Sequence, residues 1–176
     1  DVKVRQAIRY AIDMDTIGKN LFDDTIIPAN SLTPNGADKV DGLDNYDFNP
    51  EKAKELLKEA NWDPNYTIDV VYYYTDQLTV DFMTAIQSYL SDVGIKMEFR
   101  LVEGDLATIL WKAPEDQVNG PSAVDWDMAY AANAALSMHE YYDRYRSGQP
   151  SNSHTPSDDT LSKLIDATNS SVDPEV

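Results

Sequence analysis

The chain has 176 residues, of which 42% are hydrophobic and 10% aromatic, which is enough for one domain with a sizeable core. Its 31 acidic and 14 basic residues give a formal net charge of −17, which would repel phosphate backbones and anionic lipid headgroups. We therefore expect no nucleic-acid partner and no direct binding to lipid headgroups. The absence of cysteine excludes disulfides, thiolate metal sites and a cysteine nucleophile.

Two short helices are predicted at the start of the chain. Apolar residues recur at helical spacing from Val4 to Ile12, and Asp13 or Asp15 then stands where the N-cap of a second helix, running through Ile17 to Leu21, is expected. Residues 23–49 are rich in Pro, Gly, Asn and Asp, so we predict a long irregular segment, a type that is usually functional or mobile. No stretch approaches the ~18 apolar residues of a membrane helix.

A strand–helix–strand unit is the clearest pattern in the middle of the chain. It follows a helix that is predicted to start at Asn49 and Pro50. Residues 67–74 are β-branched and aromatic, a helix with an apolar stripe from Leu78 to Val93 ends at Gly94, and residues 95–101 alternate as a second strand. This order predicts parallel strands joined by a right-handed crossover.

The last third of the chain predicts one more strand and two helices. Trp126, Met128 and Tyr130 fall on one side of a strand, and HEYYDRYR is helical in pattern. A final helix, capped by Ser157 or Asp158, is predicted from the spacing of Leu161, Leu164, Ile165 and Thr168. The order of elements predicts an α/β layered fold, with residues 1–176 forming a single domain. Because the chain starts at Asp1 without a leader pattern, we expect it to be a piece of a longer protein.

Few catalytic or metal-binding patterns are present. His139 and His154 have no zinc-ligand spacing, and no GxSxG, phosphate loop or GxGxxG occurs among the seven glycines. Asp125 and Asp127 would point to the same side of a strand, as an acid/base or metal pair does, but such pairs arise by chance in so acidic a chain. We expect no enzyme activity, no cofactor and no metal, and a hydrolase that uses these two aspartates is the alternative.

The carboxyl ends of the strands are the candidate ligand edge, because open α/β sheets usually bind ligands there. Tyr72, Tyr73 and Tyr74 close one strand, and either core packing or ligand contact explains them. Residues 131–138 follow the last predicted strand. They could form a structural turn or line the ligand site, and the sequence leaves both interpretations open. Asn133 is the polar residue of interest, since its amide can both donate to and accept from a peptide backbone.

Several segments together resemble one family. VRQAIRYAIDMDTI, PANSLTP, NPEKAKELLKEANW, AIQSYLSDVGIKMEFRLVEGD, DWDMAY and LSKLIDA follow one another in the order found in the second large lobe of bacterial family 5 solute-binding proteins. These are the oligopeptide and dipeptide receptors of ABC importers, and the matching segments run from residue 2 to about residue 167.

The resemblance implies a periplasmic-binding-protein type II-like lobe with a mixed, mainly parallel sheet flanked by helices. It implies a two-lobed receptor that closes on an extended peptide, with this chain supplying most of one lobe and the partner lobe absent. The expected partners are the peptide and the membrane permease subunits, and the receptor is expected to be monomeric. It is expected at the outer face of the membrane, lipid-anchored in Gram-positive bacteria, or otherwise in the periplasm. Alternative family ligands are an oligosaccharide, a nickel chelate or haem.

The resemblance also implies the ligand-binding residues. They are Ala131, Ala132, Asn133, Ala134, Leu136 and Ser137 after the strand, with Asn30, Ser31 and Thr33 of PANSLTP as secondary candidates, for which turn formation is the alternative role. The family commonly has an aspartate near the position of Leu136 that pairs with the free amino group of the peptide. Here no acid occurs before Glu140, so we expect longer peptides held by their main chain, without strict anchoring of the amino terminus, or with Glu140 as the acid.

Overall fold

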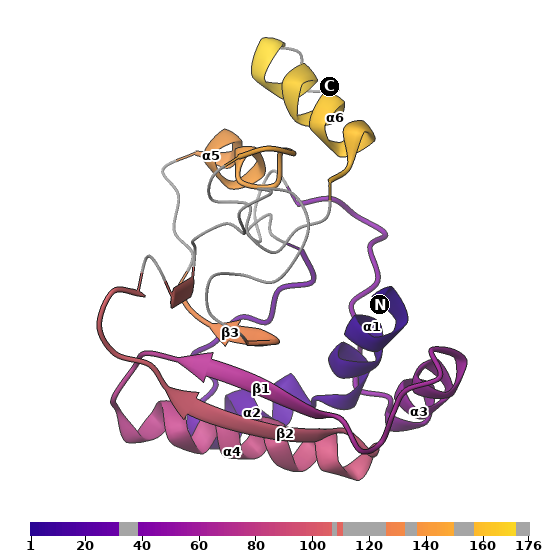
Figure 1. Cartoon of the computed structure of the whole chain (residues 1–176), viewed down its shortest axis with the longest axis vertical. Coiled ribbons are helices and arrows are strands. Elements are labelled where there is room, and N and C mark those ends of the chain that lie inside the picture. Colours follow the sequence, from indigo (N-terminus) through magenta and orange to yellow (C-terminus); the bar gives the residue numbers. More distant parts are fainter. Residues whose placement is uncertain (32–38, 107–108, 111–125, 133–136, 150–156, 172–176) are drawn as a thin grey trace. The chain divides into compact units, whose positions relative to one another are not determined.

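The computed structural model describes residues 1–31, 39–106, 109–110, 126–132, 137–149 and 157–171. The chain divides into two compact units, Asp1–Leu101 and Val102–Val176 (Figure 1). That residues 1–176 form a single domain stays a prediction.

The first unit begins with the two predicted helices, α1 (Val2–Ala11) and α2 (Met14–Leu21). The carboxylate of Asp1 accepts from the amides of Lys3 and Val4 at the start of α1. Asp13 rather than Asp15 is the N-cap of α2, since its side chain accepts from the amide of Thr16 at 2.9 Å. The side chain thereby satisfies one of the amides that a helix start leaves without a backbone partner.

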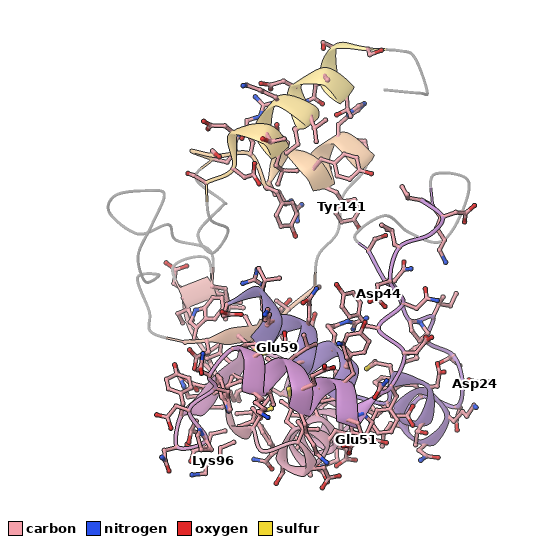
Figure 2. The ribbon with its side chains drawn as sticks, turned by 90° about the vertical axis from the view of Figure 1, so that its right-hand side faces the viewer. Asp24, Asp44, Glu51, Glu59, Lys96 and Tyr141 are labelled. Carbon is pink, nitrogen blue, oxygen red and sulfur yellow. The ribbon has the colours of Figure 1, made fainter. Side chains whose placement is uncertain are left out.

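Helix α3 (Pro50–Glu59) packs on α1 through small side chains. As predicted, Asn49 is its N-cap and Pro50 takes the first turn. Ala7, Ala11 and Ala53 are each at most 1% exposed, so the two helices approach closely where they meet. At the other end of α3, Glu59, which Figure 2 labels, pairs with Lys3 at 2.9 Å.

Strands β1 (Thr67–Tyr72) and β2 (Lys96–Leu101) pair in parallel, as predicted, in a register that runs from Thr67 opposite Lys96 to Tyr72 opposite Leu101. Ile68, Val70 and Val71 are almost completely buried, so both faces of β1 are covered. The prediction extended β1 to Tyr74, two residues too far, because the tyrosine run itself reads as strand.

Helix α4 (Gln77–Asp92) connects the strands and lies along one face of the β1–β2 pair (Figure 1). Its buried stripe contains Thr79, Phe82, Met83 and Leu90, whereas Leu78, which was predicted to face inward, is 41% exposed. The Asp76 side chain accepts from both the amide and the hydroxyl of Thr79, which fixes the first turn with Thr79 on the inner face. Gly94, at φ +88°, then turns the chain out of the helix as predicted.

The alternation predicted for β2 is observed over most of its length. Ile95 and Met97 are buried, while Lys96, Glu98 and Arg100 are exposed. Arg100 forms a bidentate pair with Asp69 of β1: its Nε donates to Oδ1 at 3.1 Å and a terminal nitrogen donates to Oδ2 at 2.8 Å. Leu101, which shares the apolar side of the alternation with Ile95 and Met97, is 39% exposed, because the strand ends at this residue.

The second unit contains β3 (Met128–Tyr130), α5 (Met138–Asp143) and α6 (Asp159–Ser170). Arg146 joins α5 to α6 by ion pairs with Asp143 at 3.1 Å and Asp166 at 2.7 Å. Asp158, not Ser157, caps α6. Ile165 is buried, whereas Leu164, the next residue back on the helix, is 59% exposed.

Candidate functional site

The residues predicted after the last strand begin directly at the end of β3. Ala131 is half-buried and Ala132 exposed, and neither belongs to a helix or strand. Ser137 is the N-cap of α5, and its hydroxyl accepts from the amide of Glu140 at 3.3 Å, so it has a structural role. Asn133, Ala134 and Leu136 lie outside the described residues. A ligand contact by any of these residues stays a prediction.

The secondary candidates Asn30 and Ser31 are both half-buried in the irregular segment that follows α2. Asn30 donates from its side-chain amide to the amide oxygen of Asn45 at 2.8 Å, which joins two parts of this segment that are 15 residues apart. Thr33 lies outside the described residues. Asn30 also lines a pocket.

That pocket has a volume of about 350 Å³ and lies within the first unit. It is formed by the end of α1, the start of α2, residues 28–30, which we call the PAN segment, and the stretch before α3. Its lining comprises Arg9, Ile12, Asp13, Met14, Asp15, Pro28, Ala29, Asn30, Lys39, Asn45, Tyr46, Asp47 and Phe48. We refer to it below as the Tyr46 pocket.

One wall of the Tyr46 pocket is fastened to α1 by hydrogen bonds. The hydroxyl of Tyr10 donates to one carboxylate oxygen of Asp44, which Figure 2 labels, and the other oxygen accepts from the amide of Tyr46 at 2.8 Å. The carbonyl of Tyr10 accepts from the amide of Asn49 at 2.8 Å. The irregular segment before α3 is thus held in a defined position by contacts with a residue more than 30 positions earlier in the chain.

Tyr46 itself adopts a left-handed backbone conformation, with φ +52°. An aromatic residue takes this conformation only where its surroundings hold it there. The ring of Tyr46 packs against Tyr10, with centroids 5.2 Å apart, and the Arg9 guanidinium lies 5.9 Å from its centroid. Arg9 also donates to the carbonyl of Ala29 at 3.1 Å, so it links this wall to the PAN segment.

The hydrogen bond to Asp44, followed by burial and the charge of Asp44, raises the pKa of Tyr10 to about 12. The same hydrogen bond, together with the amide of Tyr46, lowers the pKa of the Asp44 carboxyl. The negative carboxylate and the neutral hydroxyl thus stabilise one another, and the wall is most stable when Asp44 is charged and Tyr10 is protonated.

Alkaline pH should therefore loosen this wall. A tyrosine whose folded-state pKa is raised contributes stability that is fully present below pH 10 and is lost between pH 10 and about 12. We expect wild-type protein to lose thermal stability across this window more steeply than Tyr10→Phe, which keeps the ring and lacks the proton. Parallel melting curves for the two proteins at each pH would contradict the role given to Tyr10.

The other candidates from the sequence are the tyrosines at the end of β1 and the aspartates beside β3. Tyr73 and Tyr74 follow β1, with ring centroids 4.4 Å apart and hydroxyl oxygens 3.1 Å apart, and both are half-buried. Asp127 is exposed, and Asp125 lies outside the described residues. Within the described ranges, no three His, Cys, Asp or Glu side chains are grouped as a metal site.

Glu140 is the acid that the sequence leaves available for a peptide amino group. It lies in the first turn of α5, where its carboxylate is 3.6 Å from Arg144, and 49% of its side chain is exposed. Glu140 is therefore a surface carboxylate that already pairs with Arg144. In the described parts of the chain, no helix has the length and apolar character needed to cross a membrane.

Known proteins resemble this chain in both sequence and fold. A Brucella ovis protein named as an ABC transporter peptide-binding protein is 36% identical over 108 residues, which are 58% of this chain and 20% of the relative. The oligopeptide-binding protein AppA of Bacillus subtilis is 26% identical over 165 residues, which are 85% of this chain and 29% of AppA. The chain thus spans between a fifth and a third of the length of these relatives.

Solved structures confirm the predicted periplasmic-binding-protein type II fold. AppA of Bacillus subtilis, solved in complex with a nonapeptide, matches 99% of this chain and 37% of its own chain with a TM-score of 0.77 at 22% identity. NikZ of Campylobacter jejuni, solved with Ni(L-His), gives a TM-score of 0.75 at 20% identity, again covering 99% of this chain and 37% of its own.

The family model described as bacterial extracellular solute-binding proteins, family 5 Middle, matches residues 1–155. That match covers most of the chain and includes both the PAN segment and the residues that follow β3. The resemblance seen in the sequence is confirmed, and the chain belongs to the family 5 bacterial extracellular solute-binding proteins.

Proposed function

We propose that the parent protein is the solute-binding component of a peptide ABC importer, which binds extended oligopeptides between two lobes and delivers them to the permease. The observation that carries this proposal is the alignment of 85% of the chain with an oligopeptide-binding relative. The chain covers 29% of that relative, so the second lobe and the permease contacts are inferred for the parent protein.

The start of the predicted ligand edge suits a peptide backbone. Ala131 and Ala132 follow β3 with side chains of one methyl group each, which leave room for a second main chain beside them. Backbone hydrogen bonds in the manner of an added strand give affinity that is independent of the peptide sequence. We assign contact with the peptide main chain to this segment, including Asn133, Ala134 and Leu136, with Asn30, Ser31 and Thr33 in a supporting role.

The family consists of extracellular transport proteins rather than enzymes. We extend this to the parent: a monomeric receptor outside the cell membrane or in the periplasm, without catalytic activity of its own. A turnover assay with peptides incubated with the purified receptor tests the last point, because released fragments would show hydrolysis.

A nickel-chelate receptor is the second candidate function. It is favoured by the shared fold of NikZ, whose structure contains Ni(L-His). Peptide binding is preferred because the sequence relatives described above are named for peptides.

The decisive experiment uses the full-length receptor purified from its own cells. Native mass spectrometry should show bound masses that fragment as peptides, and calorimetric titration of the emptied receptor should give saturable binding of peptides. Ni(L-His), a neutral oligosaccharide and haem are the comparison ligands. Saturable binding of one of these, with no peptide bound, would refute the peptide proposal.

Blocking the amino terminus of the peptide should have little effect. Since Glu140 is exposed and pairs with Arg144, we expect N-acetylated and free peptides to differ by less than about threefold in Kd. Glu140→Gln should change neither value. If acetylation or Glu140→Gln abolishes binding, the peptide is anchored by its amino group after all.

A further inference from the structure

We infer that the Tyr46 pocket is a subsite for one basic side chain, lysine or arginine, of the transported solute. This inference rests on the proposed function, because it takes the solute to be a peptide. It concerns the pocket of the first unit and is separate from the main-chain contacts assigned to the segment after β3.

The charges of the pocket favour a cation. Its lining contains two basic side chains, Arg9 and Lys39, and three carboxylates, Asp13, Asp15 and Asp47. The chain as a whole carries a formal charge of −17, so the long-range field also attracts cations. The net charge of the pocket lining and the net charge of the chain are therefore both negative.

The contacts that these charged groups make within the protein increase the excess of carboxylates available to a ligand. Arg9 is already engaged with the carbonyl of Ala29 and the ring of Tyr46. Asp13 is engaged as the N-cap of α2, accepting from the amide and hydroxyl of Thr16 at 2.9 and 2.7 Å. Among the described residues, neither Asp15 nor Asp47 takes part in an ion pair. Two carboxylates thus remain for a ligand, opposed by one ammonium group, that of Lys39.

The uncharged lining suits the rest of such a side chain. Ile12, Met14 and Phe48 offer apolar surface for the methylene stem of lysine or arginine, which prefers such contact while its head stays polar. The face of Tyr46 already attracts a guanidinium, that of Arg9. The Tyr10–Asp44 contact holds Tyr46 in place before any ligand arrives, so its ring does not have to be ordered on binding.

The size of the pocket limits what it can hold. A volume of about 350 Å³ lies at the lower end of the ~300–1,000 Å³ that is typical of small-molecule pockets. It fits one side chain of a peptide and is too small for several residues. The expected result is a preference at one peptide position, added to sequence-tolerant binding of the main chain.

The test uses the full-length receptor and peptides that differ at one position. Lysine is compared with norleucine, arginine with citrulline, and both with glutamate, at each position in turn. We expect one position at which the basic residue lowers Kd by about five- to tenfold relative to its neutral isostere, with glutamate binding worst.

A pair of charge variants links this preference to the pocket. Asp15→Asn combined with Asp47→Asn should abolish the difference in Kd between the lysine and norleucine peptides, chiefly by weakening the binding of the lysine peptide. The control combines Asp24→Asn with Asp92→Asn, two exposed aspartates that do not line the pocket, and it changes net charge equally. The control should keep the full preference.

The outcomes separate this inference from the proposed function. If no peptide binds, the proposed function fails. If peptides bind but basic and neutral residues are equivalent at every position, or the Asp15/Asp47 variant keeps the preference, the subsite is refuted while peptide binding stands. A preference for glutamate would show that Arg9 and Lys39 dominate and would overturn the inference.

Discussion

Replacing Leu90 by alanine should cost the first unit about 2–5 kcal/mol of unfolding free energy. Leu90 is 0% exposed and lies on the inner face of α4, which packs on β2. Deleting its side chain removes buried apolar surface and leaves a cavity that the surrounding side chains fill only in part. Chemical denaturation followed by far-ultraviolet circular dichroism measures the loss.

The matched control is Leu78→Ala in the same helix. Leu78 is 41% exposed, so the same chemical change should cost well under half as much. Equal losses at the two positions would mean that α4 does not pack on the sheet with the face described.

Enlarging Ala53 to leucine should destabilise the contact between α1 and α3 by about 1–3 kcal/mol. Ala53 is 0% exposed, and the alanines that α1 contributes, Ala7 and Ala11, are 0% and 1% exposed. Three added carbons have no free space there, so the helices must move apart or the new side chain must leave its preferred rotamer. Thermal and chemical denaturation of Ala53→Leu measure the effect.

Lys58→Leu is the control for Ala53→Leu, because it introduces the same side chain into the same helix at a position outside the core. Lys58 lies on α3 and is exposed, so a leucine there meets solvent and should change stability by no more than about 0.5 kcal/mol. A stable Ala53→Leu protein would contradict the close approach of α1 and α3.

The sequence predicts local structure well where a side chain acts on its own backbone. Asn49 with Pro50, and Gly94, mark the ends of helices in the sequence and do so in the structure. Asp13 and Asp158 were each one of two candidate caps, because neighbouring polar residues have similar propensities and only geometry distinguishes them.

Which face of a helix is buried was harder to predict. Leu78 and Leu164 belong to apolar stripes, yet both are exposed. A stripe is wider than the surface that covers it, so contacts with other elements decide which of its members are buried. Thr79 takes the inner position in α4 because its hydroxyl is satisfied by Asp76.

The sequence does not predict the Tyr46 pocket, although Asn30, which lines it, was named as a secondary ligand candidate. Its geometry depends on the contact of Tyr10 with Asp44, which are 34 residues apart, and no periodicity or motif connects them. Tyr46 also lies in a segment whose composition predicts only irregular structure. A positive φ at an aromatic residue is a property of the folded chain, and the sequence carries no signal for it.

The charged outer side chains of β2 also have a consequence for self-association. Lys96, Glu98 and Arg100 alternate along a strand that, within the described residues, pairs on one side with β1. A second copy that docked against the other side would bring its own Lys, Glu and Arg beside these, and each would lose part of its hydration. Such strands resist the edge-to-edge growth that leads to fibrous aggregates.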